Sequence, residues 1–181
     1  MKKHLALGFR LALFVAVVVA MLSVVNMLTR NTISERNRIA GEEARAALMD
    51  GTFSQVTDFS VPEEYADAVT AVYRAEKDGT VIGYCFDVAV KGYNEISMIV
   101  GINTDLTVTG VKILAQTETP GIGSKAVDEA GVFLPQFKGL PYRNLDSVET
   151  VSGATISSKG IVSGVKASVA VCSAILEGKG E

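Results

Sequence analysis

A short run of small and hydroxyl residues near the end of the chain has the composition of a phosphate site. It consists of Ser152, Gly153, Ala154 and Thr155. The apolar residues after it recur at helical spacing, so Thr155 is expected at or beside the N-terminus of the last helix. Such an end has unpaired backbone N–H groups and a positive dipole, and Gly153 and Ala154 leave room for the phosphate of a cofactor. The alternative is that Ser152 or Thr155 is only a helix cap.

A second loop with the composition of a ligand site lies between an expected strand and an expected helix. It contains Thr119, Pro120, Gly121, Ile122 and Gly123. Two glycines around one apolar residue let the backbone approach a flat ligand closely. The spacing does not fit a Walker loop, and the match to the loose Rossmann pattern lies outside any βαβ unit. A Rossmann site is therefore a minor alternative, and a plain turn that starts a helix is the other.

The residues needed for several other chemistries are missing from the larger part of the chain. The single histidine is His4, so we expect no Ser-His-Asp arrangement and no His-ligated zinc site beyond the N-terminal segment. Cys85 and Cys172 each lie in an apolar pattern, which favours buried thiols over a disulfide. We therefore expect no catalytic side chain and no metal site, and we expect a cofactor to supply the chemistry.

The first thirty residues predict a membrane anchor. The uncharged run from Leu11 to Thr29 would form a helix of about 28 Å, close to the thickness of a bilayer core. No small-x-small cleavage site is present before Arg30, so an uncleaved anchor is favoured over a signal peptide. The count of Lys and Arg on the two sides does not decide the orientation. The short N-terminus, which has no acidic residue, is expected in the cytoplasm, with the rest on the extracytoplasmic face.

The remaining chain is acidic and is expected to form two parts. The first thirty residues contain four of the 17 basic residues and none of the 20 acidic ones, so the remainder is a poor nucleic-acid binder. We expect a cytoplasmic stub and anchor at 1–30, a membrane-proximal helix and loop at 31–65, and a ligand-binding domain at 66–181.

The expected elements follow from the periodicity after the anchor. A capping box at 32–35 would start a helix to about Met49 that continues from the anchor or packs near it, and the alternative is a solvated stalk. A loop would come next at 51–62. The period then changes to two. Strands are expected at 68–76, 80–93, 96–102 and 108–114, paired as hairpins in an antiparallel meander. Helices at 125–134 and from 155 onward would cover one face, after an extended segment at 145–151. The fold class is α+β.

With both loops in place, the chain resembles the FMN-binding domain family, and most closely the G subunit of the Rnf complex, an ion-translocating ferredoxin:NAD oxidoreductase. The resemblance covers nearly the whole chain and implies an FMN-binding domain at 66–181. It rests on the N-terminal helix and on these stretches: 83–88, 91–93, 100–102, 108–114, 118–123, 136–139 and 152–155.

The resemblance implies a covalently bound cofactor. In that family the threonine of the Gly-Ala-Thr motif carries FMN through a phosphoester bond made by a flavin transferase, which implies attachment at Thr155. The loop at 119–123 would lie near the flavin. The family usually has Asp three residues before the Ser, where this chain has Glu149. The implied role is one electron relay among the other membrane subunits of the complex, coupled to movement of Na⁺ or H⁺.

Three alternatives to this role remain open at the level of the sequence. One is the C subunit of a Na⁺-translocating quinone reductase, a family whose members tend to be longer. Another is an anchored surface flavoprotein outside any pump. The third is an anchored assembly module in which the Ser-Gly-Ala-Thr run only caps a helix.

Overall fold

The computed structural model describes residues 2–57, 59, 61–62, 65 and 67–178. The chain divides into two compact units, Met1–Ala40 and Gly41–Glu181. The first unit is most of the long helix α1, which spans Lys2–Leu48. The second unit contains the last two turns of α1 and a six-stranded sheet.

The six strands lie in the sheet in the order in which they occur in the chain, and every neighbouring pair is antiparallel. Their bounds, from β1 to β6, are Thr52–Val56, Val69–Lys77, Thr80–Lys91, Glu95–Asn103, Thr107–Gln116 and Leu140–Pro141. The predicted α+β class and the antiparallel meander are therefore confirmed.

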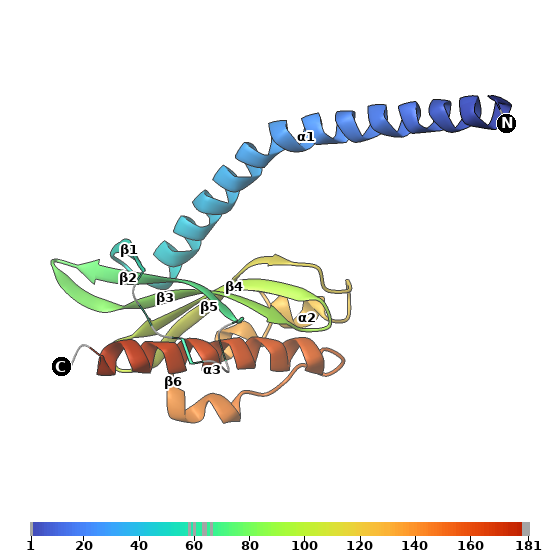
Figure 1. The fold of residues 1–181 in the computed structure, drawn as a ribbon. Helices are drawn as coiled ribbons and strands as arrows, with labels where there is room; N and C mark the ends of the chain where they lie inside the picture. Colours follow the sequence, from blue (N-terminus) through green and yellow to red (C-terminus); the bar gives the residue numbers. More distant parts are fainter. Residues whose placement is uncertain (1, 58, 60, 63–64, 66, 179–181) are drawn as a thin grey trace. The chain divides into compact units, whose positions relative to one another are not determined.

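Helix α3 covers one face of the sheet. It spans Thr155–Glu177 and runs along the strands (Figure 1). Tyr84 and Phe86 of β3 are fully buried in the apolar core on this face. The helix can approach closely because it has glycine at the crossing point: a Cβ on Gly164 would lie 2.7 Å from Cγ1 of Val90.

The last turns of α1 pack on the opposite face of the sheet. Side chains alternate along a strand, so Cys85 and Asp87 of β3 point away from α3. Arg45 of α1 is 6% exposed and donates from Nη2 to both carboxylate oxygens of Asp87, at 3.0 and 2.7 Å. Its guanidinium carbon lies 3.5 Å from the ring centroid of Tyr73. Burial raises the pKa of Asp87 above its ordinary value, although the charge of Arg45 acts in the opposite direction.

Replacing Arg45 by Met is expected to lower the free energy of unfolding by about 3 kcal/mol, because the largely buried carboxylate of Asp87 loses its cation. The folded-state pKa of Asp87 is already raised, so protonation relieves the unpaired charge. The loss of unfolding free energy in Arg45→Met should therefore be largest near neutral pH and become smaller as the pH falls. Urea unfolding of the full chain in detergent, followed by circular dichroism, measures it.

The matched control for this substitution is Arg38→Met, which removes the cation of an exposed pair with Glu35. Exposed pairs contribute little to stability, so its unfolding curve should nearly overlay that of the wild type. Equal losses in the two variants would contradict the role given to Arg45.

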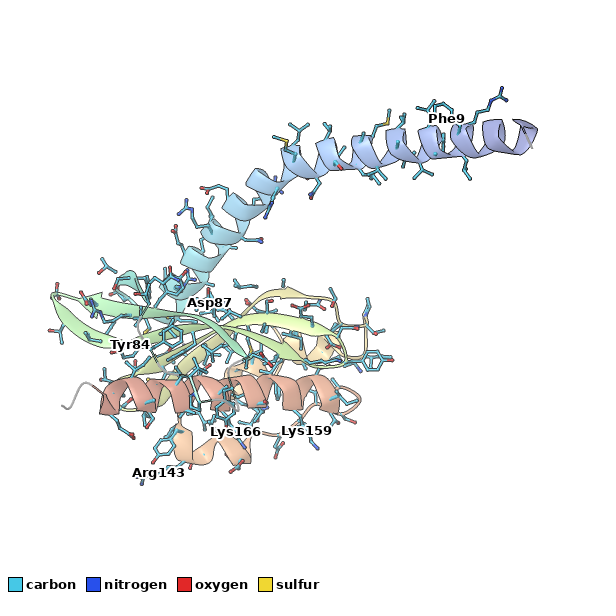
Figure 2. All side chains as sticks on the ribbon, viewed as in Figure 1. Phe9, Tyr84, Asp87, Arg143, Lys159 and Lys166 are labelled. Carbon is cyan, nitrogen blue, oxygen red and sulfur yellow. The ribbon has the colours of Figure 1, made fainter. Side chains whose placement is uncertain are left out.

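Helix α1 is a candidate membrane span. The stretch Gly8–Leu48 has a mean hydropathy of 2.7 over its most apolar window. Large apolar side chains are exposed along the stretch from Phe9 to Leu28 (Figure 2), and Phe9 is 71% exposed. Among the described residues, the other helix that is long and apolar enough is α3, which is the core helix of the sheet. Because α1 is continuous, the helix continues from the N-terminal segment as expected, and the predicted separate helix start at 32–35 is wrong. The side chains of 31–34 lie outside the described residues.

The prediction that 51–62 is entirely loop is wrong, because this segment contains the edge strand β1. Only Phe53 and Val56 of this strand are half-buried, and the other three residues are exposed. An edge strand with so few apolar residues has no clear period of two. Its pairing with β2, with Thr52 opposite Glu76, depends on the rest of the sheet.

The region after β5 contains less α-helix than predicted. Helix α2 comprises only Ser124–Val127, and the prediction of a helix at 125–134 is wrong. Asp128 stops the helix because its backbone is extended and its carboxylate accepts the N–H of Ala130 at 3.0 Å. Two 3-10 helices come next, η2 at Leu134–Phe137 and η3 at Tyr142–Ser147. The predicted extended segment 145–151 is therefore wrong in its first three residues.

The two cysteines are free and buried, and they belong to different apolar clusters. The alternative of a disulfide between Cys85 and Cys172 is therefore wrong. Burial raises the pKa of both thiols to about 12. We expect neither to react with iodoacetamide in the folded protein at about pH 8, and both to react in denaturant, as measured by mass spectrometry. Because the folded state holds these protons more tightly, stability should fall as the pH rises above about 9. Rapid labelling of the native protein would contradict this expectation.

Candidate functional site

Three segments that are far apart in the sequence form a cleft of about 570 Å³ at the N-terminal end of α3. They are the turn between β3 and β4, the loop before α2, and the first turn of α3. The lining residues are Tyr93, Glu118, Thr119, Ile122, Gly123, Gly153, Ala154, Thr155, Ile156 and Ser157. Cofactor sites have volumes of this order, so this cleft is the candidate site.

Hydrogen bonds of Asn94 connect the β3–β4 turn to the loop before α2. Its backbone N–H donates to Oε1 of Glu118 at 3.0 Å, and its side-chain amide donates to the carbonyl of Thr117 at 2.8 Å. On the other side, α3 presents Gly160 to the same turn, and a Cβ there would lie 2.8 Å from the carbonyl oxygen of Lys91. The hydrogen bonds of Asn94 and the close approach of Gly160 to Lys91 therefore fix the walls of the cleft.

The two glycines of the loop before α2 meet different requirements. Gly121 has φ +78° with open space around it, so it provides the left-handed conformation of the turn. Gly123 has φ −61°, a conformation open to any residue. A Cβ on Gly123 would overlap Oε2 of Glu118 and lie 2.9 Å from Oγ of Ser157. Gly123 is therefore required for space at the wall of the cleft.

Glu118 is a buried carboxylate in this wall, with 5% of its surface exposed. Its Oε1 accepts the backbone N–H of Asn94, whereas its buried Oε2 has no hydrogen-bond partner among the described residues. A buried carboxylate oxygen without a donor is unfavourable. We therefore expect a ligand in the cleft to supply a donor.

Thr155 is the exposed first residue of α3. The N-cap position is taken by Ala154, which has no hydroxyl, so the alternative that Ser152 or Thr155 caps the helix is wrong. The turn before the helix is held instead by Ser158, whose Oγ accepts the N–H of Val151 at 3.1 Å. The hydroxyl of Thr155 and the N–H groups of the first turn together suit an anionic ligand.

The structure brings together six of the nine predicted site residues. Thr119, Ile122, Gly123, Gly153, Ala154 and Thr155 line the cleft. Pro120, Gly121 and Ser152 are exposed beside it and do not line it.

Four lining residues were not predicted from the sequence: Tyr93, Glu118, Ile156 and Ser157. Three of them are neighbours of the predicted residues, and an acidic residue directly before the glycine loop was a usable signal. Tyr93 belongs to the stretch 91–93 on which the resemblance rests, but no local pattern placed it at the site, because its position depends on the turn between β3 and β4.

The fold and the cleft define a class of protein that comparison with known families identifies. Residues 92–170 match the FMN-binding domain family, and this stretch contains every residue that lines the cleft. The chain belongs to the family of G subunits of ion-translocating oxidoreductase complexes. It is 32% identical over 132 residues to the G subunit of the ion-translocating oxidoreductase complex of Methanosarcina acetivorans, covering 67% of this chain and 68% of that protein.

Two further relatives match over most of their length. The G subunit of the Na⁺-translocating ferredoxin:NAD⁺ oxidoreductase complex of Acetobacterium woodii is 29% identical, over 91% of this chain and 89% of that protein. The G subunit of the ion-translocating oxidoreductase complex of Vibrio vulnificus is 27% identical, over 90% and 86%. The crystal structure of NqrC from Shewanella oneidensis aligns with a TM-score of 0.46 and 23% identity, over 64% of this chain and 62% of that chain.

Proposed function

We propose that this chain is an electron-carrying subunit of an Rnf-type ion-translocating complex and that it carries FMN in phosphoester linkage to Thr155. The observation that carries this proposal is the cleft itself. It brings the exposed hydroxyl of Thr155, at the start of a 23-residue helix, next to the glycine loop of an FMN-binding domain.

The phosphate end of FMN fits the start of α3. The first-turn N–H groups and the helix dipole favour an anion there, and Gly153, with φ +79°, makes the turn that leaves them accessible. No Lys or Arg lines the cleft in the part of the chain that the structure describes. A phosphate without a cation would be held weakly, so a covalent bond at Thr155 accounts for how this chain keeps its cofactor.

The flavin end fits the remaining walls. Tyr93, Ile122 and Ile156 line the cleft with 57–67% of their surface exposed, and they offer apolar surface to a flat ring. The space beside Gly123 and the unpartnered oxygen of Glu118 suit an aromatic group that has an N–H or O–H donor.

The flavin supplies transfer of one or two electrons when it is bound. The chain's own residues hold it, limit its contact with water and fix its position. We assign the remaining membrane subunits of the complex as electron donors and acceptors, because the relatives are named as subunits of such complexes. Turnover by the isolated subunit is not expected.

A flavin transferase is the expected partner in maturation. Gln136 holds the segment before the Ser-Gly-Ala-Thr motif by two hydrogen bonds. Its side-chain N–H donates to the carbonyl of Glu149 at 3.1 Å, and its Oε1 accepts the backbone N–H of Glu149 at 2.9 Å. The side chain of Glu149 is exposed, so its carboxylate is free to contact the transferase in place of the usual Asp.

We further propose that α1 spans the membrane with its N-terminus in the cytoplasm and the sheet unit on the extracytoplasmic face, where the transferase would act. Fusion of alkaline phosphatase after Glu181 tests this orientation. The alkaline phosphatase fusion is expected to be active. An inactive phosphatase fusion, together with an active β-galactosidase fusion at the same position, would place the sheet unit in the cytoplasm and contradict the proposed orientation.

Co-expression with and without a flavin transferase tests the function. The full chain in detergent should give a fluorescent band after denaturing electrophoresis only when the transferase is present. A colourless protein, obtained with a transferase that flavinylates a control substrate, would return the chain to the class of anchored assembly modules.

A further inference from the structure

Glu118 lines the cleft with a buried carboxylate that the protein itself satisfies only in part. Its carboxylate is 5% exposed, and Oε2 is buried with no hydrogen-bond partner among the described residues. No Lys or Arg in the described part of the chain lies within ion-pair distance of it, and its Oε1 has only the backbone N–H of Asn94.

The surroundings hold Oε2 at the wall of the cleft. The missing side chain of Gly123 leaves the space that this oxygen occupies, and Oγ of Ser157 lies near the same point. The missing side chain of Gly92 does the same for Oε1, because a Cβ there would lie 2.5 Å from it. Two glycines therefore make room for the carboxylate of Glu118, although its Oε2 accepts no hydrogen bond from the described residues.

We propose that Glu118 accepts a hydrogen bond from an N–H or O–H group of the bound FMN and that its negative charge lowers the reduction potential of the cofactor. This inference rests on the proposed function. Two-electron reduction of FMN with uptake of one proton from water gives the anionic reduced flavin, so the cofactor gains one negative charge. A fixed negative charge in a partly desolvated wall opposes that increase more strongly than one in water. Glu118 would thereby make this FMN a stronger electron donor.

The test is a redox titration of the flavinylated full chain in detergent, with dithionite as the reductant, a set of mediators, and the flavin absorbance as the readout. Glu118→Gln keeps the shape and removes the charge. At the midpoint potential of the wild type, the ratio of reduced to oxidised FMN should be about tenfold higher in this variant, which for two electrons is an upward shift of about 30 mV.

The matched control is Glu95→Gln. Glu95 lies at the start of β4, close to Glu118 through the bond from the N–H of Thr117 to the carbonyl of Glu95, at 3.2 Å. Its side chain is exposed, so water screens its charge and the control should titrate like the wild type. Equal shifts in the two variants, or no shift in Glu118→Gln, would overturn the proposal.

A second measurement needs no cofactor. In apo protein prepared without the transferase, Glu118→Gln should raise the melting temperature, because a neutral amide replaces a buried charge and can donate from the atom that lacked a partner. If the carboxylate of Glu118 instead stabilised the fold, Glu118→Gln would lower the melting temperature of the apo protein. That result would overturn the proposal. Absence of FMN from the wild-type protein with an active transferase would instead contradict the proposed function.

Discussion

Thr155→Ala is expected to abolish covalent flavin completely. The substitution removes the hydroxyl that forms the phosphoester and leaves the helix start intact, because the N-cap is Ala154 and no cap bond from residue 155 is lost. Alanine is also the best helix former. The fluorescent band should therefore vanish while the melting temperature of the apo protein changes little. In-gel fluorescence and a thermal melt on the same preparation measure both.

The control for Thr155→Ala is Thr150→Ala, which removes another exposed hydroxyl from the same segment. It should retain the fluorescent band at wild-type intensity. If the band survives in Thr155→Ala, the attachment site is elsewhere and the role given to the start of α3 is wrong.

Gly123→Ala is expected to have the second largest effect. The backbone of Gly123 suits alanine, so the cost comes only from the added Cβ, which would overlap Oε2 of Glu118 and crowd Oγ of Ser157. Either the carboxylate or the first turn of α3 must move. We expect a loss of about 2–3 kcal/mol in the free energy of unfolding and a several-fold lower yield of flavinylated protein.

Gly121→Ala separates the two roles of glycine in this loop. The position has φ +78° and open space, so only the left-handed conformation costs energy, about 1 kcal/mol. The cleft stays open, and flavin attachment should be near the wild-type level. Urea unfolding and in-gel fluorescence compare Gly121→Ala with Gly123→Ala. An equal loss of attached flavin in the two variants would show that flavin attachment does not depend on the space at Gly123.

Elements with a long and regular pattern were predictable from the sequence. The central strands β3 and β4 are long and rich in buried residues, and α3 has apolar residues at helical spacing because it packs one face on the sheet. The edge strands β1 and β6 and the 3-10 helices lack such a face. Their conformations depend on the sheet beside them and on local bonds such as the one between Asp128 and Ala130, which a period cannot reveal.

The site was predictable where residue type carries the requirement. Thr155 and Gly123 were predicted as site residues from their types, a hydroxyl at a helix start and a glycine in a turn, and both line the cleft. Glu118 and Tyr93 lie in the cleft because of tertiary contacts, namely the bond from Asn94 and the packing of Gly160 against Lys91. No spacing along the chain encodes those contacts.

Peptide mapping tests the central claim most directly. Trypsin should release the peptide 144–159 from protein co-expressed with a flavin transferase, since no Lys or Arg lies between Arg143 and Lys159. Tandem mass spectrometry should find the mass of FMN less one water on this peptide, with fragment ions that assign it to Thr155. An unmodified peptide, or a flavin assigned to another hydroxyl such as Ser152 or Ser157, would contradict attachment at Thr155.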